Sequence, residues 1–104
     1  MARITVSKKA RKDLVGIHQY IRDELCNPPA AQRILAALKK SILHLEFFPD
    51  SGRPLDALLP IHTEYRYLVC ENYCIFYLSN GAEVSIIRIL HQRQDCLKAL
   101  FVDR

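Results

Sequence analysis

Two stretches in the first half of the chain carry apolar residues at helical spacing. The first follows a short β-prone run at residues 3–6 and consists of Ala10, Leu14, Ile17, Ile21 and Leu25. Intervals of three or four residues place these side chains on one face of an amphipathic helix. Ser7, just before the stretch, is a favourable N-cap. The pattern predicts a helix over about residues 8–26.

The second stretch begins after Asn27-Pro28-Pro29. The residue before a proline is pushed out of the α region, so the first helix ends here. Asn27 as cap and Pro28 at the first helical position suit the start of a new helix. Its apolar residues are Ala31, Ile34, Leu35, Leu38, Ile42, Leu45 and Phe48. We therefore predict two antiparallel helices joined by a tight break, an αα-hairpin.

A loop dense in turn-forming residues follows the helices. It starts at Pro49 and continues through Gly52, Pro54 and Pro60 to about Thr63. Connections of about a dozen residues are uncommon in small domains and are often functional. Arg53 and His62 are its candidate contacts.

The second half alternates strand-like runs with turn signals. The runs cover residues 65–70, 73–79 and 83–91, and residues 96–101 suggest a short C-terminal helix or extension. Asn80-Gly81 is a strong hairpin signal and Glu71-Asn72 a weaker one. The predicted fold is α+β in the order β-α-α-β-β-β, as one domain over residues 1–104. An antiparallel sheet would carry the helical hairpin on one face.

The turns also predict a register for this sheet. With Asn80 and Gly81 at the centre of the last turn, Tyr73 lies opposite Arg88. One face would then show Arg66, Tyr73, Tyr77 and Arg88 around Leu68, Ile75 and Ile86. The opposite face would show Tyr67, Val69, Cys74, Phe76, Leu78, Ile87 and Ile89, to be covered by the helices. We thus expect a core face and an open Arg/Tyr face.

Composition limits the class of protein. The 104 residues are 50% hydrophobic and 25% charged, the balance of one ordinary globular domain. The sequence contains no apolar run of about 18 residues and no secretory signal, so we expect a cytoplasmic protein without a membrane partner. The net charge of +4 favours an acidic partner, either nucleic acid or an acidic protein segment.

Four basic residues, Lys8, Lys9, Arg11 and Lys12, occupy the start of the first predicted helix. Their sign is unfavourable at the positive end of the helix dipole, at a cost of a few tenths of a kcal/mol each. They form either a solvated face or a basic patch for an acidic partner.

The four cysteines, Cys26, Cys70, Cys74 and Cys96, are expected to be reduced and mainly packed in the core. Their spacing contains no CxxC pair, so we predict no metal site. Motifs of the common enzyme classes are also absent from the sequence, including the glycine-rich phosphate loop and HExxH. We expect neither a cofactor nor a small-molecule substrate.

An open face with arginines and tyrosines suits phosphate and base contacts, and equally an acidic peptide. Cleavage of RNA would require an acid, a base and cationic support. His91 with Arg66 and Arg88 could supply these groups. Strict alternation places His91 on the core face, however, so a structural role is the alternative. Asp95 near Arg93 is consistent with a local surface ion pair.

Several motifs in order resemble the RelE/ParE family of toxins from bacterial toxin–antitoxin pairs. These are Ser7, Ala10, Asp13 and Leu14, then the Gly52-Arg53-Pro54 turn, the tyrosine-rich strand pair, and the segment from Arg88 through His91 and Arg93 to Asp95. The similarity covers nearly the whole chain. It implies a toxin held inactive by a cognate antitoxin that wraps it with an extended or helical segment.

The resemblance implies one of two activities. RelE-like members cleave mRNA on the ribosome, often with an arginine in a Tyr-Arg-Leu-Val-Tyr strand motif, and Cys74 stands at that position here. The Leu-His-x-Arg-x-Asp ending looks like that of ParE-like members, which poison DNA gyrase. Gyrase is therefore slightly favoured as the target, and whether the protein is an enzyme stays open. A third possibility is an inactive module that only binds antitoxin. Target or nucleic-acid contacts would be Arg53, Tyr73, Tyr77 and Arg93.

Overall fold

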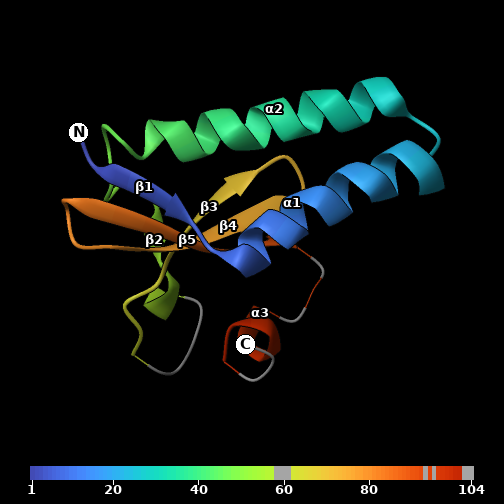
Figure 1. Cartoon of the computed structure of the whole chain (residues 1–104). Helices are drawn as coiled ribbons and strands as arrows, with labels where there is room; N and C mark the ends of the chain where they lie inside the picture. Colours follow the sequence, from blue (N-terminus) through green and yellow to red (C-terminus); the bar gives the residue numbers. More distant parts are fainter. Residues whose placement is uncertain (58–61, 93, 95, 102–104) are drawn as a thin grey trace.

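A five-stranded sheet forms the centre of the molecule, with two long helices on one face and a short helix on the other (Figure 1). The computed structural model describes residues 1–57, 62–92, 94 and 96–101. In chain order the elements are β1 (Arg3–Val6), α1 (Lys8–Gln19), η1 (Tyr20–Glu24), α2 (Pro28–His44), β2 (Arg53–Pro54), η2 (Leu55–Ala57), β3 (Arg66–Cys70), β4 (Tyr73–Ser79), β5 (Glu83–His91) and α3 (Cys96–Phe101).

The predicted helical hairpin is confirmed, together with both of its caps. The Ser7 side chain accepts a hydrogen bond from the Ala10 N–H, and the Asn27 side chain accepts one from the Ala30 N–H. The first helix differs from the prediction at its end, where η1 continues α1 as a π-helical turn. Cys26 then takes a positive φ of 51° to reverse the chain.

The strand order is β1-β5-β4-β3-β2, which confirms the α+β class with one refinement. The strands β3, β4 and β5 are antiparallel as expected, and the short β2 is antiparallel to β3, but β1 runs parallel to β5. Parallel pairing is possible because the helical hairpin between β1 and the later strands provides the long crossover that it requires. Residues predicted as loop also form the short edge strand β2.

The predicted register between β4 and β5 is wrong. The Asn80 N–H bonds the Glu83 carbonyl, so Gly81 and Ala82 are the central turn residues, one position later than expected. A β-bulge then interrupts the ladder, since Phe76 pairs with Arg88 whereas Tyr77 pairs with Ile86. A bulge shifts the alternation of side chains beyond it. The other predicted turn, at Glu71-Asn72, has the expected register.

Both faces of the sheet carry an apolar core, which corrects the prediction of an open Arg/Tyr face. The helices pack on the face expected to be open, with Tyr73, Ile75, Tyr77 and Ile86 in their core. The face assigned to the helices instead packs against the C-terminal helix and η2. Its core consists of Leu55, Tyr65, Tyr67, Phe76, Leu90 and Leu100. The tyrosines that suggested a binding face are therefore largely core residues.

The described residues contain no helix that is both long enough and apolar enough to cross a membrane.

Candidate functional site

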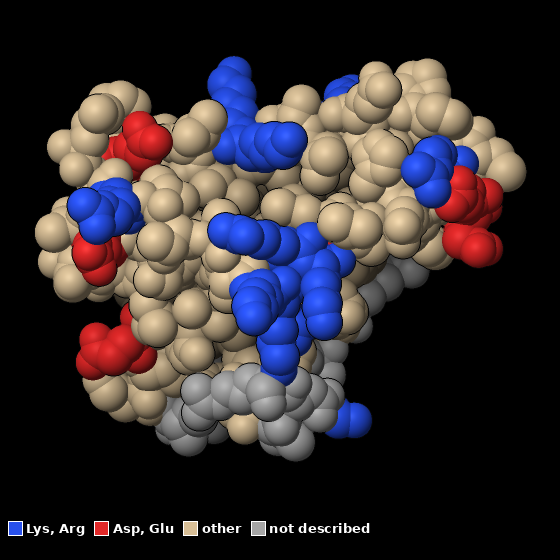
Figure 2. All heavy atoms as spheres, viewed as in Figure 1, with Lys and Arg blue, Asp and Glu red and all other residues tan. Residues whose placement is uncertain are grey.

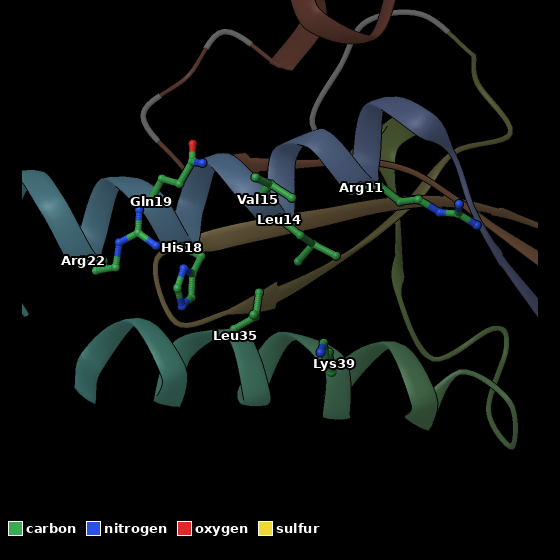
Figure 3. Close-up of a pocket in the computed structure, with 8 residues that line it drawn as sticks. All are labelled: Arg11, Leu14, Val15, His18, Gln19, Arg22, Leu35 and Lys39. Atoms are coloured by element: carbon green, nitrogen blue, oxygen red, sulfur yellow. The ribbon is translucent and has the colours of Figure 1, made fainter. Parts of the chain in front are cut away.

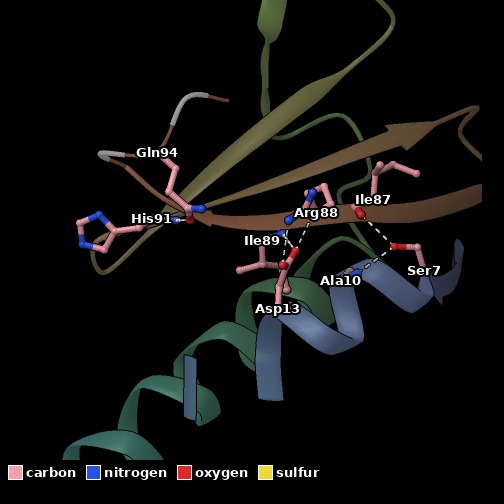
Figure 4. Close-up of polar contacts among 8 residues, drawn as sticks. All are labelled: Ser7, Ala10, Asp13, Ile87, Arg88, Ile89, His91 and Gln94. Carbon is pink, nitrogen blue, oxygen red and sulfur yellow. Dashed lines mark hydrogen bonds and ion pairs between the residues drawn. The ribbon is translucent and has the colours of Figure 1, made fainter. Parts of the chain in front are cut away.

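Helix α1 starts at the edge of β5, where β1 stops pairing with that strand. Ser7 joins the two elements: its N–H donates to the Ile86 carbonyl, and its hydroxyl donates to the Ile87 carbonyl over 2.8 Å (Figure 4). The same hydroxyl accepts from Ala10, which is fully buried against the sheet. The Ser-x-x-Ala part of the motif thus attaches the helix to the sheet.

Asp13, one turn further along α1, forms the main polar contact with β5. Its carboxylate accepts two hydrogen bonds from the Arg88 guanidinium, at 2.8 and 3.0 Å, and one from the Ile89 N–H at 2.9 Å (Figure 4). The two side chains are only 17% and 15% exposed. A bidentate pair at this depth fixes both groups and cancels their charges locally. The prediction that Arg88 lies on an open face with Arg66, Tyr73 and Tyr77 is therefore wrong.

Arg66 lies at a different place, beside the loop before β2. Its guanidinium donates to the Gly52 carbonyl over 2.8 Å and lies 3.8 Å from the Asp50 carboxylate. Tyr77 contacts the same loop, because its hydroxyl accepts from the Gly52 N–H over 2.8 Å. Burial raises the pKa of Tyr77, and the Gly52 hydrogen bond opposes that rise. Two predicted site residues thus hold one loop in place.

The glycine of the Gly52-Arg53-Pro54 turn is explained by this contact. A Cβ at Gly52 would collide with the Tyr77 hydroxyl and would lie only 2.9 Å from the Tyr67 carbonyl oxygen. Only a residue without a side chain permits this close approach. Arg53 follows on β2, exposed and paired with Tyr67 across the ladder.

Tyr73 and His91 meet at the opposite end of β4, about 13 Å from Tyr77 as estimated from the strand rise. The two residues are paired across the strands, with their rings edge to face and 5.3 Å between centroids. They border a groove of about 600 Å³ between α1 and the end of β5. Its lining comprises Lys12, Asp13, Gly16, Ile17, Tyr20, Tyr73, Ile89, His91 and Gln94.

Burial raises the pKa of Tyr73, with the nearby Tyr20 adding to the effect. The hydroxyl therefore stays protonated near neutral pH and can donate a hydrogen bond. The backbone N–H of His91 donates to the side-chain oxygen of Gln94 over 2.8 Å (Figure 4).

Basic side chains gather over the start of α1, in the middle of the face shown in Figure 2, while acidic side chains lie toward its sides. Lys8, Arg11 and Lys12 are exposed and Lys9 is half-buried. The first turn of α1 contains no acidic residue. We call these four residues the basic ridge. Arg11 lines the groove between the helices, and Lys12 lines the groove beside β5.

The groove between α1 and α2 has a volume of about 490 Å³ and an apolar floor with basic sides. Leu14, Val15 and Leu35 lie between cationic side chains that come from both helices (Figure 3). The polar lining residues are Arg11, His18, Gln19, Arg22 and Lys39. Val15 is 57% exposed, so this surface is open to a partner.

The remaining candidates add no further site. His62 is exposed and contacts Asp56, whose pKa is lowered mainly by a hydrogen bond from the Thr63 N–H. Arg93, together with Asp95, lies outside the described residues. Within the described part of the chain, His, Cys, Asp and Glu side chains form no group of three that could hold a metal ion.

The predicted site is therefore divided between a loop anchor at Arg66 and Tyr77 and an aromatic groove at Tyr73 and His91. Sequence reasoning missed the partner of Arg88. The available signal was that Asp13 is the acidic residue that directly follows the basic cluster. Reasoning from sequence also passed over Lys12 and Tyr20 as groove residues. Tyr20 lies outside the apolar stripe of the first helix, as expected for a residue that faces away from the core.

Comparison with known proteins agrees with this fold. The family model for the ParE toxin of type II toxin–antitoxin systems, parDE, matches residues 4–96. A solved structure described as the chromosomal ParDE TA system from P. aeruginosa is 22% identical with a TM-score of 0.72. The match covers 88% of this chain and 96% of that chain, and at this identity it shows the fold alone. No curated protein sequence matches the chain significantly.

The resemblance inferred from the sequence motifs is thus confirmed. Because the ParE model matches almost the whole length from β1 to the start of α3, the chain belongs to the ParE toxin family of type II toxin–antitoxin systems.

Proposed function

We propose that this toxin arrests growth by acting on DNA gyrase and does not cleave mRNA. Membership in the family makes the chain the toxin component of a toxin–antitoxin pair with a cognate antitoxin as partner. The observation that carries the choice of target is the dispersal of the three groups that a nuclease site would require.

Cleavage of RNA needs an acid and a base beside cationic groups that stabilise charge on the phosphate. The Arg88 guanidinium is neutralised by Asp13, and Arg66 donates to a carbonyl of the loop. His91 lies beside Tyr73, at the end of β4 far from Arg66. These three groups do not converge, which favours gyrase over the ribosome.

The experiment compares the two activities with one protein preparation. Purified toxin is incubated with gyrase, ATP and supercoiled plasmid, and trapped cleavage complexes are counted as linear DNA after denaturation. We expect linear DNA only when both toxin and gyrase are present. Primer extension on translated mRNA should show no toxin-dependent cuts. Cuts that disappear in Arg66→Ala, Arg88→Ala or His91→Ala, without any effect on gyrase, would reverse the assignment.

For the antitoxin, we propose that the groove between α1 and α2 receives an amphipathic helix with acidic flanks. The apolar floor at Leu14, Val15 and Leu35 suits the apolar side of such a helix. The basic sides from Arg11 and Lys39 complement acidic residues next to that side. The net charge of the toxin, +4, supports the same partner.

Two valines of equal exposure provide a matched test. Val15 and Val69 are each 57% exposed, but only Val15 lines this groove. Val15→Asp should weaken binding to the product of the adjacent reading frame about tenfold or more, since it places a charge at a buried contact. Val69→Asp should change affinity little. Equal losses in calorimetry would place the antitoxin elsewhere, and rising salt should weaken the complex because exposed charges are screened.

A further inference from the structure

The groove between α1 and the end of β5 has features that are required neither by the contact between Asp13 and Arg88 nor by the predicted catalytic role of His91. Its volume of about 600 Å³ lies within the range of small-ligand sites. Its floor combines Ile17 and Ile89 with Gly16, where an added Cβ would meet no atom within 4 Å. The space above the floor is thus open to a flat group.

Tyr73 contributes a polar group to this groove. Tyr73 is only 8% exposed, and among the described residues no fully buried side-chain nitrogen or oxygen atom lacks a hydrogen-bond partner. A buried tyrosine hydroxyl usually has a hydrogen-bond partner. Because Tyr73 lines the groove, its hydroxyl can donate a hydrogen bond to a bound molecule.

Two further rings offer stacking surfaces beside Tyr73. Tyr20 is 53% exposed on the α1 side, and the half-buried His91 lies on the β5 side. Tyr20 is the first residue of the π-helical turn η1. Such turns are rare and often occur at functional sites. The groove thus presents aromatic surface from both of its walls.

The electrostatics of the groove favour an anion. Lys12 contributes an exposed ammonium group and also belongs to the basic ridge with Lys8 and Arg11. Lys8, Arg11 and Lys12 lie three and four residues apart, so they share one side of the helix. The carboxylate in the lining, Asp13, is bound to Arg88 and to the Ile89 N–H, which reduces its repulsion of an anion.

We propose that the basic ridge and this groove together bind a single-stranded polynucleotide. Phosphates lie along Lys8, Arg11 and Lys12, and one base enters the groove between Tyr20 and His91 with its edge toward the Tyr73 hydroxyl. A row of cations beside exposed rings is the usual arrangement for single-strand binding. An acidic peptide would use the ridge but would leave the rings without a role. A paired duplex keeps its bases stacked and could not fill the groove.

The test uses fluorescence anisotropy with purified toxin and labelled oligonucleotides of about 12 nucleotides, a length that fits such sites. Oligo-dT, oligo-U and a dA·dT duplex are compared at low salt. We expect saturable binding to at least one single strand, tighter than to the duplex. Tighter binding of oligo-U would identify RNA as the ligand, and equal or tighter binding of oligo-dT would identify DNA. Both results support the proposal.

Variants separate the rings from the charges. Tyr20→Ala should weaken single-strand binding about tenfold, the typical loss for one stacked base, whereas Tyr20→Phe should retain it. Lys12→Ala should reduce the slope of log affinity against log salt by about 0.7. Lys40→Ala, on the exposed side of α2, is the matched control and should change neither value. Circular dichroism verifies that each variant is folded.

Three results would overturn the proposal. The first is no saturable binding of any oligonucleotide. The second is duplex binding as tight as single-strand binding with no effect of Tyr20→Ala, which would leave only general attraction to the ridge. The third is that polyglutamate displaces the oligonucleotide and binds wild type and Tyr20→Ala with equal affinity. That result would assign the surface to acidic protein segments. None of these results depends on whether gyrase is the target.

Discussion

Arg88 and Arg66 were expected to act together, yet they stabilise two separate parts of the molecule. Arg88 binds the carboxylate of Asp13 and connects β5 to α1, with its side chain 17% exposed. Arg66 donates to the Gly52 carbonyl and connects β3 to the loop before β2, with its side chain 32% exposed. Arg88 thus lies in a shielded ion pair, whereas Arg66 lies nearer to solvent with a longer contact to the exposed Asp50.

The difference shows that the contribution of an arginine on a strand to stability depends on its partner. A charge removed from water is strongly destabilising unless an opposite charge and hydrogen bonds replace the lost hydration. Asp13 satisfies that requirement for Arg88, whereas Arg66 keeps part of its hydration beside the Gly52 carbonyl and the Asp50 carboxylate. The helix contact should therefore be far more sensitive to substitution than the loop contact.

The largest effect is expected for Asp13→Ala. The change leaves the Arg88 guanidinium without its carboxylate and the Ile89 N–H without its acceptor. Removing one partner of a fully buried pair costs about 3–5 kcal/mol, and for this largely shielded pair that range is the upper limit of the expected decrease in the free energy of unfolding in urea titrations. The double variant Asp13→Leu with Arg88→Met should recover much of that loss. A loss below about 1 kcal/mol for Asp13→Ala would show that the pair does not hold the helix.

An intermediate effect is expected for Gly52→Ala in the loop contact. The new methyl group would collide with the Tyr77 hydroxyl and the Tyr67 carbonyl. Overpacking of this kind costs about 1–3 kcal/mol in the free energy of unfolding. Tyr77→Phe removes the hydroxyl and part of the collision, so the double variant should cost less than the sum of the single variants. Strict additivity would contradict the contact.

A smaller effect is expected for Arg66→Ala. The variant loses the hydrogen bond to the Gly52 carbonyl, but the guanidinium is partly solvated. We expect a loss of about 1 kcal/mol, well below that of Asp13→Ala. Arg53→Ala, exposed on the neighbouring strand β2, is the matched control and should stay within about 0.5 kcal/mol of wild type. A loss for Arg66→Ala equal to that for Asp13→Ala would remove the distinction between the two anchors.

The smallest effect is expected from a change of pH, at the contact between Asp56 and Thr63 in the loop that follows β2. The Thr63 N–H holds the pKa of Asp56 below its ordinary value of 3.8. A lowered pKa means that the contact contributes stability above the unfolded-state value and loses it as pH falls through the folded-state value. The Thr63 amide signal in NMR should therefore shift as pH falls below about 4. Asp56→Asn should abolish that shift, and a titration unchanged in this variant would contradict the assignment.

Local chemistry in the sequence was sufficient for the two long helices and their N-terminal caps. Ser7 and Asn27 act as caps because a short polar side chain accepts a hydrogen bond from an N–H three residues later, whatever lies elsewhere in the fold. The turn at Glu71-Asn72 and its register were predicted for the same reason. The order of the sequence motifs also identified the family.

The faces of the sheet could not be predicted in this way. Both faces are apolar, so alternation alone did not show which one the helices cover. A turn displaced by one residue and the bulge at Phe76 and Tyr77 changed which residues lie opposite one another along β5. A bulge has no reliable sequence signal here, and every residue beyond it changes its neighbours.

By itself the sequence determined the helical hairpin, the order of the four longer strands along the chain, the basic start of α1 and the family. Only the tertiary structure decided that Tyr77 belongs to the core, that Tyr73 and His91 border a groove with Tyr20, and that Arg88 binds Asp13. The physical reason is the separation along the sequence between the residues that interact. Helix periods and caps depend on residues three or four positions apart, whereas Arg88 and Asp13 are separated by 75 residues and meet only when α1 packs against β5.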